Sequence, residues 1–475
     1  MSGPRIKSTE EHELKLAVEP DFELPELAGT ELEPRLFTST YYDAPDLRLA
    51  RLGITLRRRT ENGKALWQLK LPQGDHRLEL EVAGPPAKPP AELTRLLVGV
   101  LRAAPLAPVT TLRTRRKGIR VTRRSEPLAD VVVDSVSVLE ARRVVARFRE
   151  LEIERINGGW KGLQKVERAL RDAGAHPGDG RPKALQVLGV QDPAQKPGDD
   201  SEQLQGALRT QFLALAHADP AVRLDRDAED LHDLRVAVRR LRAIIRAGAP
   251  ALAPALVEPL REELRWLGRL LGPVRDLDVL RAALRAEAEG LEDAEQAALR
   301  PFFAALSRER AAAKKKMRAG LESARYLDLL DRLAGFVEMP PEQPLSLKRV
   351  ARREFLKLQA KMKALGAEPE AEDLHRARIQ GKRARYAAEL AEPLAGKGAR
   401  RFIADAKNFQ DVIGAHQDAV VAEERLRSFI GRAKDGETAL ALGRLVERQY
   451  AHRRTARDRL PKAWAMLERS GARAW

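Results

Sequence analysis

Several residue types are scarce in this 475-residue chain, and each scarcity excludes or disfavours a class of function. It contains no cysteine, so disulfides, thiolate nucleophiles and cysteine-type metal sites are excluded. Aromatic residues make up only 4% of it, which disfavours single-stranded nucleic acid binding, because such binding usually needs aromatic stacking platforms. No run approaches the ~18 apolar residues of a membrane span, and the first residues lack an apolar signal core. The sequence therefore predicts a soluble, cytoplasmic protein.

Acidic residues are too few to balance the basic ones, and the formal net charge is +17. Residues 1–200 hold 34 Lys and Arg against 29 Asp and Glu, whereas residues 201–475 hold 52 against 40. This excess favours a polyanionic partner such as nucleic acid, acidic lipid or polyphosphate. The length is sufficient for two or three domains.

Composition and periodicity divide the chain into two halves. Residues 5–190 show strand-like alternation, residues 191–202 form a polar, Pro/Gly-rich linker, and residues 203–475 read almost entirely as helices. The N-terminal half begins with a strand at Glu11-His-Glu-Leu-Lys15, and Asn62-Gly63 is a hairpin signal. Further strands are predicted at 37–42, 54–59, 65–70, 77–82, 112–123, 129–138 and 144–156. Short helices are predicted at 47–52, 91–103, 161–174 and 182–188.

Charged side chains in the strands are grouped by sign. Acidic groups lie at Glu11/Glu13 and Glu150/Glu152/Glu154, and basic groups at Arg57/Arg59 and Arg113/Arg115. An ordinary antiparallel sheet also turns one charged face to water, which is the better interpretation of any single strand. If the sheet curls so that these faces meet, carboxylates suited to Mg²⁺ or Mn²⁺ would oppose guanidinium groups suited to phosphate.

The first strand and the block Tyr41-Tyr-Asp-Ala-Pro-Asp-Leu-Arg-Leu-Ala-Arg-Leu-Gly-Ile-Thr-Leu-Arg-Arg-Arg59 resemble the CYTH superfamily of triphosphate tunnel metalloenzymes. This resemblance implies an antiparallel eight-stranded β tunnel and metal-dependent triphosphate hydrolysis. It implies that metal is bound by Glu11, Glu13, Glu150, Glu152 and Glu154. It assigns phosphate binding to Lys15, Arg57, Arg59, Lys70, Arg113 and Arg115, with Arg116 as the other candidate of its cluster, and further tunnel acids to Glu79, Glu81 and Asp134.

The C-terminal half contains one basic helix motif twice. In the first copy Leu231, Leu234, Val238, Leu241 and Ile245 form an apolar stripe, and in the second Leu374, Ala377, Gly381 and Ala384 do so. A second stripe of each helix is basic. A solvated basic face explains either helix alone, but two copies in register indicate a duplicated unit, about 203–338 and 345–475. Helices are predicted at 203–217, 229–247, 254–271, 274–289, 294–318, 346–365, 371–392, 399–414, 416–432 and 437–470.

This repeated pattern resembles the CHAD domain, a duplicated helical bundle that binds inorganic polyphosphate. The resemblance assigns polyphosphate binding to His232, Arg235, Arg239, Arg240 and Arg242, and to His375, Arg378, Lys382, Arg383 and Arg385. Asp276 and Asp418 are candidate metal ligands, but pairing with nearby arginines fits them better. The predicted fold class is thus α+β, a β tunnel followed by an all-α duplicated bundle.

The leading hypothesis is an enzyme that hydrolyses inorganic triphosphate or short polyphosphate with Mg²⁺ or Mn²⁺, and whose helical half holds longer polyphosphate. Such a protein would be cytoplasmic and could associate with polyphosphate granules. Three alternatives remain: a non-enzymatic polyphosphate-binding protein, a thiamine triphosphatase or adenylate cyclase, and a nucleic-acid-binding module. The last is disfavoured because no reading motif is present.

Overall fold

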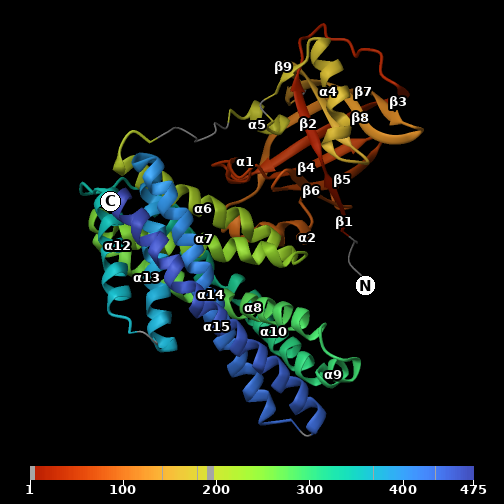
Figure 1. Cartoon of the computed structure of the whole chain (residues 1–475). Coiled ribbons are helices and arrows are strands. Elements are labelled where there is room, and N and C mark those ends of the chain that lie inside the picture. The colour runs from red at the N-terminus through yellow and green to blue at the C-terminus, as the bar shows by residue number, and fades with distance from the viewer. Residues whose placement is uncertain (1–5, 142, 179, 190–196, 367–368, 434) are drawn as a thin grey trace. The chain divides into compact units, whose positions relative to one another are not determined.

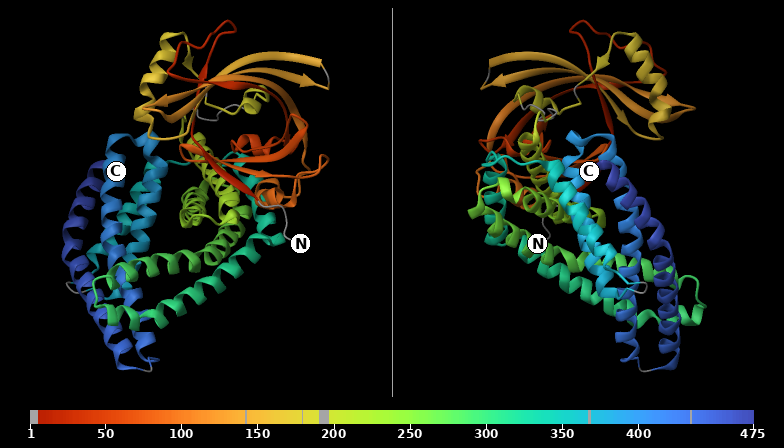
Figure 2. Two further views of the ribbon diagram at one scale, coloured as in Figure 1. Left: turned by 90° about the vertical axis from the view of Figure 1, so that its right-hand side faces the viewer. Right: turned by 60° about the vertical axis from the view of Figure 1, so that its left-hand side comes forward.

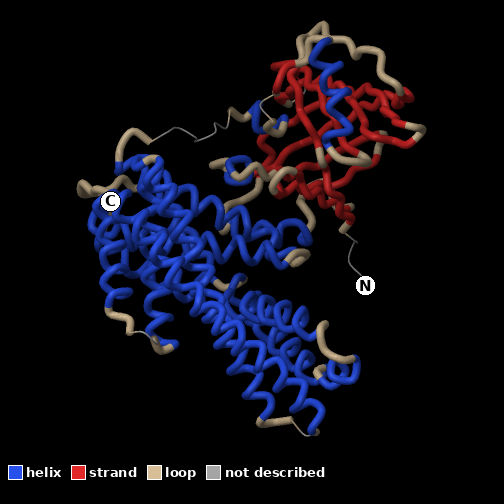
Figure 3. The backbone as a smooth tube through the Cα atoms, in the orientation of Figure 1, coloured by secondary structure: helices blue, strands red, loops and turns tan. Residues whose placement is uncertain are grey.

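The computed structural model describes residues 6–141, 143–178, 180–189, 197–366, 369–433 and 435–475. The chain forms two compact units, residues 1–194 with 219–224, and residues 195–218 with 225–475. In the described part, long strands occur only in the first unit and the second is helical (Figures 1 and 3). Residues 190–196 of the predicted linker lie outside the described residues. No helix in the described part of the chain combines the length and apolarity needed to cross a membrane.

The first unit is an antiparallel sheet with the strand order β1-β6-β5-β4-β3-β7-β8-β9-β2-β10. Its strands are β1 (Lys7–Glu11), β2 (Glu13–Ala17), β3 (Gly29–Asp43), β4 (Thr55–Glu61), β5 (Lys64–Gln73), β6 (His76–Val82), β7 (Ala107–Arg123), β8 (Glu126–Glu140), β9 (Arg143–Arg155) and β10 (His176–Pro177). Its helical segments are α1 (Arg48–Arg51), α2 (Ala91–Thr94), η1 (Arg95–Leu97), α3 (Val98–Leu101), α4 (Trp160–Asp172) and α5 (Lys183–Val187).

The predicted antiparallel sheet is confirmed, but the strand count of eight is not. The first strand is interrupted at His12 and counts as β1 and β2, and the short β10, which had no sequence signal, pairs with β2. β1 pairs with β6 and β2 pairs with β9, so one stretch of chain joins strands from both ends of the strand order. The strands curve strongly (Figure 2). The ladder of hydrogen bonds is nevertheless interrupted at His12, so the strand order is open and not a closed ring.

Alternation along the strands separates an apolar outer face from a charged inner one. On β6, Leu78, Leu80 and Val82 are buried in a core that also contains Trp67 and the residues of α2 and α3. On β9, Leu151 and Ile153 pack with Leu163 and Leu170 of α4. Because successive strand residues point to opposite faces, the charged residues between them face the interior of the curved sheet.

The second unit consists of long helices arranged as two similar series. The first is α6 (Asp200–Leu224), α7 (Ala228–Gly248), η2 (Ala249–Ala251), α8 (Pro254–Ala288), α9 (Asp293–Ala298), α10 (Arg300–Leu321) and α11 (Ala324–Glu338). The second is α12 (Leu347–Lys363), α13 (Ala371–Ala395), α14 (Lys397–Ile430) and α15 (Gly436–Ala474). α7 packs on α8 as α13 packs on α14, and α7 also packs on α13. The apolar stripes predicted for α7 and α13 are buried.

Two predicted helix breaks are wrong. α8 continues through Gly272 and Pro273, and α14 continues through Ala415, which separated the predicted helices 399–414 and 416–432. A proline removes only one backbone donor from a helix, and Leu271 and Val274 on either side are fully buried. Packing therefore outweighs the local penalty. α11 lies within the half predicted to be almost entirely helical, and it forms around buried Leu329, Leu330 and Leu333.

Candidate functional site

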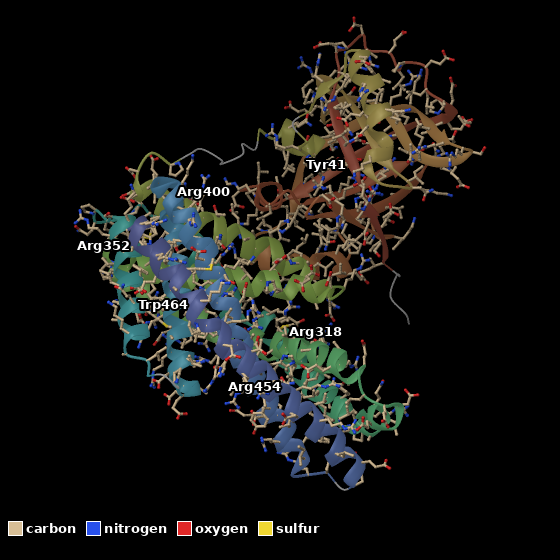
Figure 4. All side chains as sticks on the ribbon, viewed as in Figure 1. Tyr41, Arg318, Arg352, Arg400, Arg454 and Trp464 are labelled. Carbon is tan, nitrogen blue, oxygen red and sulfur yellow. The ribbon has the colours of Figure 1, made fainter. Side chains whose placement is uncertain are left out.

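The inner face of the sheet encloses a cavity of about 250 Å³. Its lining is almost entirely charged or polar. Carboxylates come from Glu11, Glu13, Glu79, Glu81, Asp134, Glu152 and Glu154, and cationic groups from Lys15, Arg35, Arg57, Arg59, Lys70, Arg77, Arg116 and Lys183. Tyr41, labelled in Figure 4, also lines it. Burying this many charges is costly unless each is paired, so the arrangement of the pairs indicates what the cavity can bind.

One wall, built by β3 and β4, is rich in arginine. Arg57 donates from Nε to Gln68 (2.7 Å) and from Nη1 to the Tyr41 hydroxyl (3.2 Å). Arg35 forms a bidentate pair with Glu61 at 2.6 and 2.8 Å, and Arg59 shares that carboxylate at 3.1 Å.

The positive charges near Arg59 outweigh the negative charge of its partner Glu61. Burial, together with the nearby charges of Arg57 and Arg35, lowers the pKa of Arg59 to about 10. Its Nε–H is buried and, in the described part of the chain, donates to no acceptor. A buried donor without a partner costs free energy. This wall therefore keeps a donor available for an anion besides Glu61.

The opposite wall, built by β2 and β9, is rich in glutamate. Burial raises the pKa of Glu13 and of Glu154, and the neighbouring carboxylates of Glu152 and Glu11 raise both further. By contrast, Lys15, Lys183 and Arg116 outweigh burial and hold the pKa of Glu152 well below its usual range. Carboxylates that raise one another's pKa are relieved by a cation, and glutamate oxygens are ligands that Mg²⁺ and Mn²⁺ prefer.

In this structure lysine and arginine side chains form ion pairs with those glutamates. Glu152 lies 2.7 Å from Lys15 Nζ and 2.6 Å from Arg116 Nη2, and Glu11 accepts from Lys70 through both oxygens at 2.6 Å. Within the described residues, these cavity carboxylates do not bring three oxygens within 4.8 Å of one another. The donor set fits a divalent cation once the lysine and arginine side chains give up some of these contacts.

Glu150 has a different position from the other predicted metal ligands. It is buried, accepts a hydrogen bond from Gln186 of α5 (3.0 Å), and pairs with Lys15 (3.3 Å) and Lys183 (2.8 Å). It does not line the cavity. The structure thus places Glu150 behind the wall, where it holds two lysines.

Arg113 and Arg115 are not brought to the cavity. Both side chains are exposed, while the alternating residues Leu112 and Thr114 are buried. The same alternation turns Arg116 inward, where it contacts Asp134 at 2.8 Å and Glu154 at 2.6 Å. The expectation that Arg113 and Arg115 face the cavity is therefore wrong, and Arg116 is the arginine of this cluster that lines it.

Three further cavity cations were missed. Arg77 shares the inner face with Glu79 and Glu81, so its signal was present in the alternation. Arg35 belongs to β3, which starts eight residues before the predicted strand. Lys183 begins α5 and reaches Asp134 (2.9 Å), Glu150 and Glu152. No local sequence signal reveals Lys183, because the docking of α5 is a tertiary event.

The helical unit brings the two predicted basic stripes together. Burial and the charges of Arg378, Arg239 and Arg385 lower the pKa of Lys382 to about 8, opposed by Asp418. Arg239 belongs to α7 and the other three cations to α13. The Arg378 Nε–H is buried and has no acceptor within the described residues. We name this group the α7/α13 cluster (Arg239, Arg378, Lys382 and Arg385). Its cations repel one another and include a buried donor without an acceptor, so it could bind an anion.

The remaining stripe residues lie beside this cluster or face α8. Arg235 pairs with Asp276 (2.9 Å), which supports the expected arginine partner for that aspartate. His375 contacts Gln417 (3.2 Å). Burial and Arg265, Arg261 and Arg269 of α8 lower the pKa of Arg242, so α8 adds cations that the sequence motif did not indicate. Arg240 lies 3.7 Å from Glu389, Arg383 is exposed, and His232 is partly buried.

Comparison with known proteins identifies both halves. A protein of Mycobacterium tuberculosis (strain ATCC 25618 / H37Rv), the uncharacterized protein Rv2226, is 28% identical over 97% of this chain and 96% of its own length. PptA from Streptomyces chartreusis is 23% identical over 56% of this chain and 99% of its own, with a TM-score of 0.48. The CHAD domain from the plant Ricinus communis is 25% identical over 58% of this chain and 96% of its own, with a TM-score of 0.47. Family models match in the order that the sequence motifs predicted, and the chain contains a CYTH domain at residues 9–178 followed by a CHAD domain at residues 206–427.

Proposed function

We propose that the CYTH domain hydrolyses inorganic triphosphate or short polyphosphate with Mg²⁺ or Mn²⁺, and that the CHAD domain binds longer polyphosphate. CYTH family members are triphosphate tunnel enzymes that generally use divalent metal ions. The observation that carries the proposal is the opposition of two walls, one with the unpartnered Arg59 Nε–H and one with the crowded carboxylates of Glu13 and Glu154. A linear polyanion with a bound cation satisfies both walls at once.

The arginine wall orients the substrate. Arg57 and Arg59 present planar donors suited to bidentate phosphate contacts, and Arg35 adds a third positive charge beside them. Lys15, Lys70 and Arg116 now rest on glutamates. As phosphate oxygens enter, these three can exchange carboxylate partners for phosphate partners, which frees the glutamates.

The freed glutamates are the proposed metal ligands. Glu11, Glu13, Glu152 and Glu154 would hold the ion, while Glu150 holds Lys15 and Lys183 in place. A bound divalent ion supplies charge neutralisation at the terminal phosphate and acidification of water. Burial raises the pKa of Glu13 and of Glu154, and whichever of the two does not bind the ion is suited to accept the proton of the attacking water.

Phosphate release tests the tunnel assignment directly. We expect the full chain to release phosphate from tripolyphosphate faster than from ATP or thiamine triphosphate, and chelator to stop it. Glu11→Ala should abolish turnover without changing the circular dichroism spectrum. Glu10→Ala is the matched control, because Glu10 lies on the same strand, is exposed and does not line the cavity.

The outcomes separate the alternatives. Equal turnover in Glu11→Ala would remove the metal assignment. Tripolyphosphate binding without release would indicate a non-enzymatic polyphosphate-binding protein. Faster release from thiamine triphosphate, or pyrophosphate and a cyclic product from ATP, would indicate the other CYTH activities.

For the CHAD domain we propose polyphosphate binding along α7 and α13. The mutual repulsion of the cations in the α7/α13 cluster and the unpartnered Arg378 Nε–H support this proposal. In the Glu11→Ala background, reversing both Arg235 and Arg378 to Glu should weaken binding of long polyphosphate about 10²- to 10⁴-fold, since each charge-assisted contact is worth about 1.5–3 kcal/mol and two are lost. The affinity should also fall as salt rises.

Net charge must be controlled in that experiment. Reversing Arg352 and Arg454 changes the net charge equally, and both are exposed and lie outside the α7/α13 cluster (Figure 4). Equal weakening in the two double variants would indicate bulk charge alone. Stronger binding of DNA than of polyphosphate would favour the nucleic-acid alternative.

A further inference from the structure

A second cluster of metal-ligating side chains lies on the opposite side of the first strand from the cavity. His12 interrupts the strand between β1 and β2, and Asp75 and His76 lie at the β5–β6 turn. The pairing of Glu11 with Arg77 places His12 next to His76 across the ladder. None of the three residues lines the cavity, whereas Glu11, Glu13 and Arg77 on alternate positions do.

The three side chains converge closely enough for a shared ion. One donor atom from each lies within 4.8 Å of the other two. His76 Nδ1 is 3.2 Å from Asp75 Oδ1, and the two imidazole rings lie 4.9 Å apart, centroid to centroid. Tetrahedral metal–nitrogen bonds of 2.0–2.1 Å separate ligand atoms by about 3.3 Å, and the His76 and Asp75 atoms already lie 3.2 Å apart.

An unpartnered atom gives independent support for a ligand. His12 Nδ1 is buried and has no hydrogen-bond partner in the described part of the chain. Buried polar side-chain atoms are normally satisfied. His12 is not fully enclosed and His76 retains 23% of its side-chain exposure, so an ion can reach them.

We propose that His12, Asp75 and His76 form a transition-metal site for an ion of the Zn²⁺, Ni²⁺ or Cu²⁺ class. Two imidazoles and one carboxylate select these borderline ions over Mg²⁺, which prefers oxygen. A bound ion would tie the interruption between β1 and β2 to the β5–β6 turn. It would thereby fix the backbone at His12, and with it the flanking residues Glu11 and Glu13, whose side chains line the cavity.

Calorimetric titration of the full chain with Zn²⁺, in excess Mg²⁺ to occupy the cavity glutamates, tests the site. We expect a binding event that Glu11→Ala retains and that His12→Asn and His76→Asn each lose. The loss should exceed the ~100-fold that removal of an outer-shell partner costs. His452→Asn is the control, since His452 is exposed and belongs to α15.

Two further measurements keep the test independent of activity and of folding defects. Zn²⁺ should raise the thermal midpoint of the wild type but not of His76→Asn. The electron paramagnetic resonance spectrum of bound Cu²⁺ should show coupling to two imidazole nitrogens. Unchanged Zn²⁺ affinity in both histidine variants, or a Cu²⁺ spectrum without nitrogen coupling, would overturn the site and leave the proposed triphosphatase untouched.

Discussion

The guanidinium carbon of Arg59 lies 3.6 Å from the centroid of the Phe37 ring. This stacking holds a charge that Arg57 and Arg35 repel, and it aligns the planar donors of Arg59 with the cavity. Phe37 and Arg59 are on paired strands, β3 and β4. Arg59 donates from Nη2 to Glu61, whereas its Nε–H has no acceptor in the described part of the chain. Stacking on an aromatic face leaves such a donor available for an anion.

Substitution of Arg59 should therefore affect substrate use more than stability. We expect Arg59→Ala to lower kcat/KM for tripolyphosphate about 10- to 100-fold, the range expected for one charge-assisted contact. Arg59→Lys should recover only part of it, because an ammonium cannot stack or bind in bidentate fashion. Steady-state phosphate release measures this, and unchanged kcat/KM in both variants would exclude phosphate binding by Arg59.

Removing an inward arginine of β7 should destabilise the domain far more than removing an outward one. Arg116→Met removes contacts to Asp134, Glu152 and Glu154 and should destabilise the domain by about 3 kcal/mol, because it leaves buried carboxylates without a partner. Arg115→Met, at an exposed site, should change the free energy of unfolding by less than about 0.5 kcal/mol. Denaturant titration distinguishes them. Equal effects would contradict the inward position of Arg116.

Loss of Lys183 should make the domain depend on added metal. Lys183→Ala leaves Asp134, Glu150 and Glu152 with less positive charge, which lowers the thermal midpoint. Mn²⁺ should restore more of the midpoint in this variant than it adds to the wild type, because ligand binding to the native state stabilises it. Arg181→Ala, which removes a nearby cation outside the cavity lining, serves as the control. No extra response to Mn²⁺ would argue against cation binding at these acids.

Polyphosphate binding by the CHAD domain should weaken at high pH. The pKa of Lys382 is lowered to about 8 by burial and by Arg378, Arg239 and Arg385, so the free side chain loses its charge as the pH rises above that value. Bound polyanion favours the charged form, and binding then takes up a proton. The affinity should be steady below about pH 7 and fall by at most tenfold per pH unit above pH 8. Lys382→Arg should flatten this profile, and an unchanged profile would exclude Lys382.

Local sequence patterns predicted the fold better than they predicted the residues of the sites. The alternation of β6 and the buried stripes of α7 and α13 follow from periodicity, and motif order predicted both domains. The prediction of which β7 residues face the cavity was wrong because residues 113–117 include four cations and offer no apolar alternation. Buried Leu112 carried the missing information, since it sets which neighbours turn inward. Lys183 and the cations of α8 depend on how separate elements dock, which no local pattern encodes.

The interruption at His12 also has a kinetic consequence. β2 (Glu13–Ala17) is synthesised before most of the sheet, yet its partner β9 is made more than a hundred positions later; Lys15 and Glu152 are 137 residues apart. Bringing such distant segments together is slow, because chain entropy is lost before contacts repay it. β2 therefore stays without its β9 partner while the intervening strands are made, and the charged interior is completed only when β2 and β9 pair.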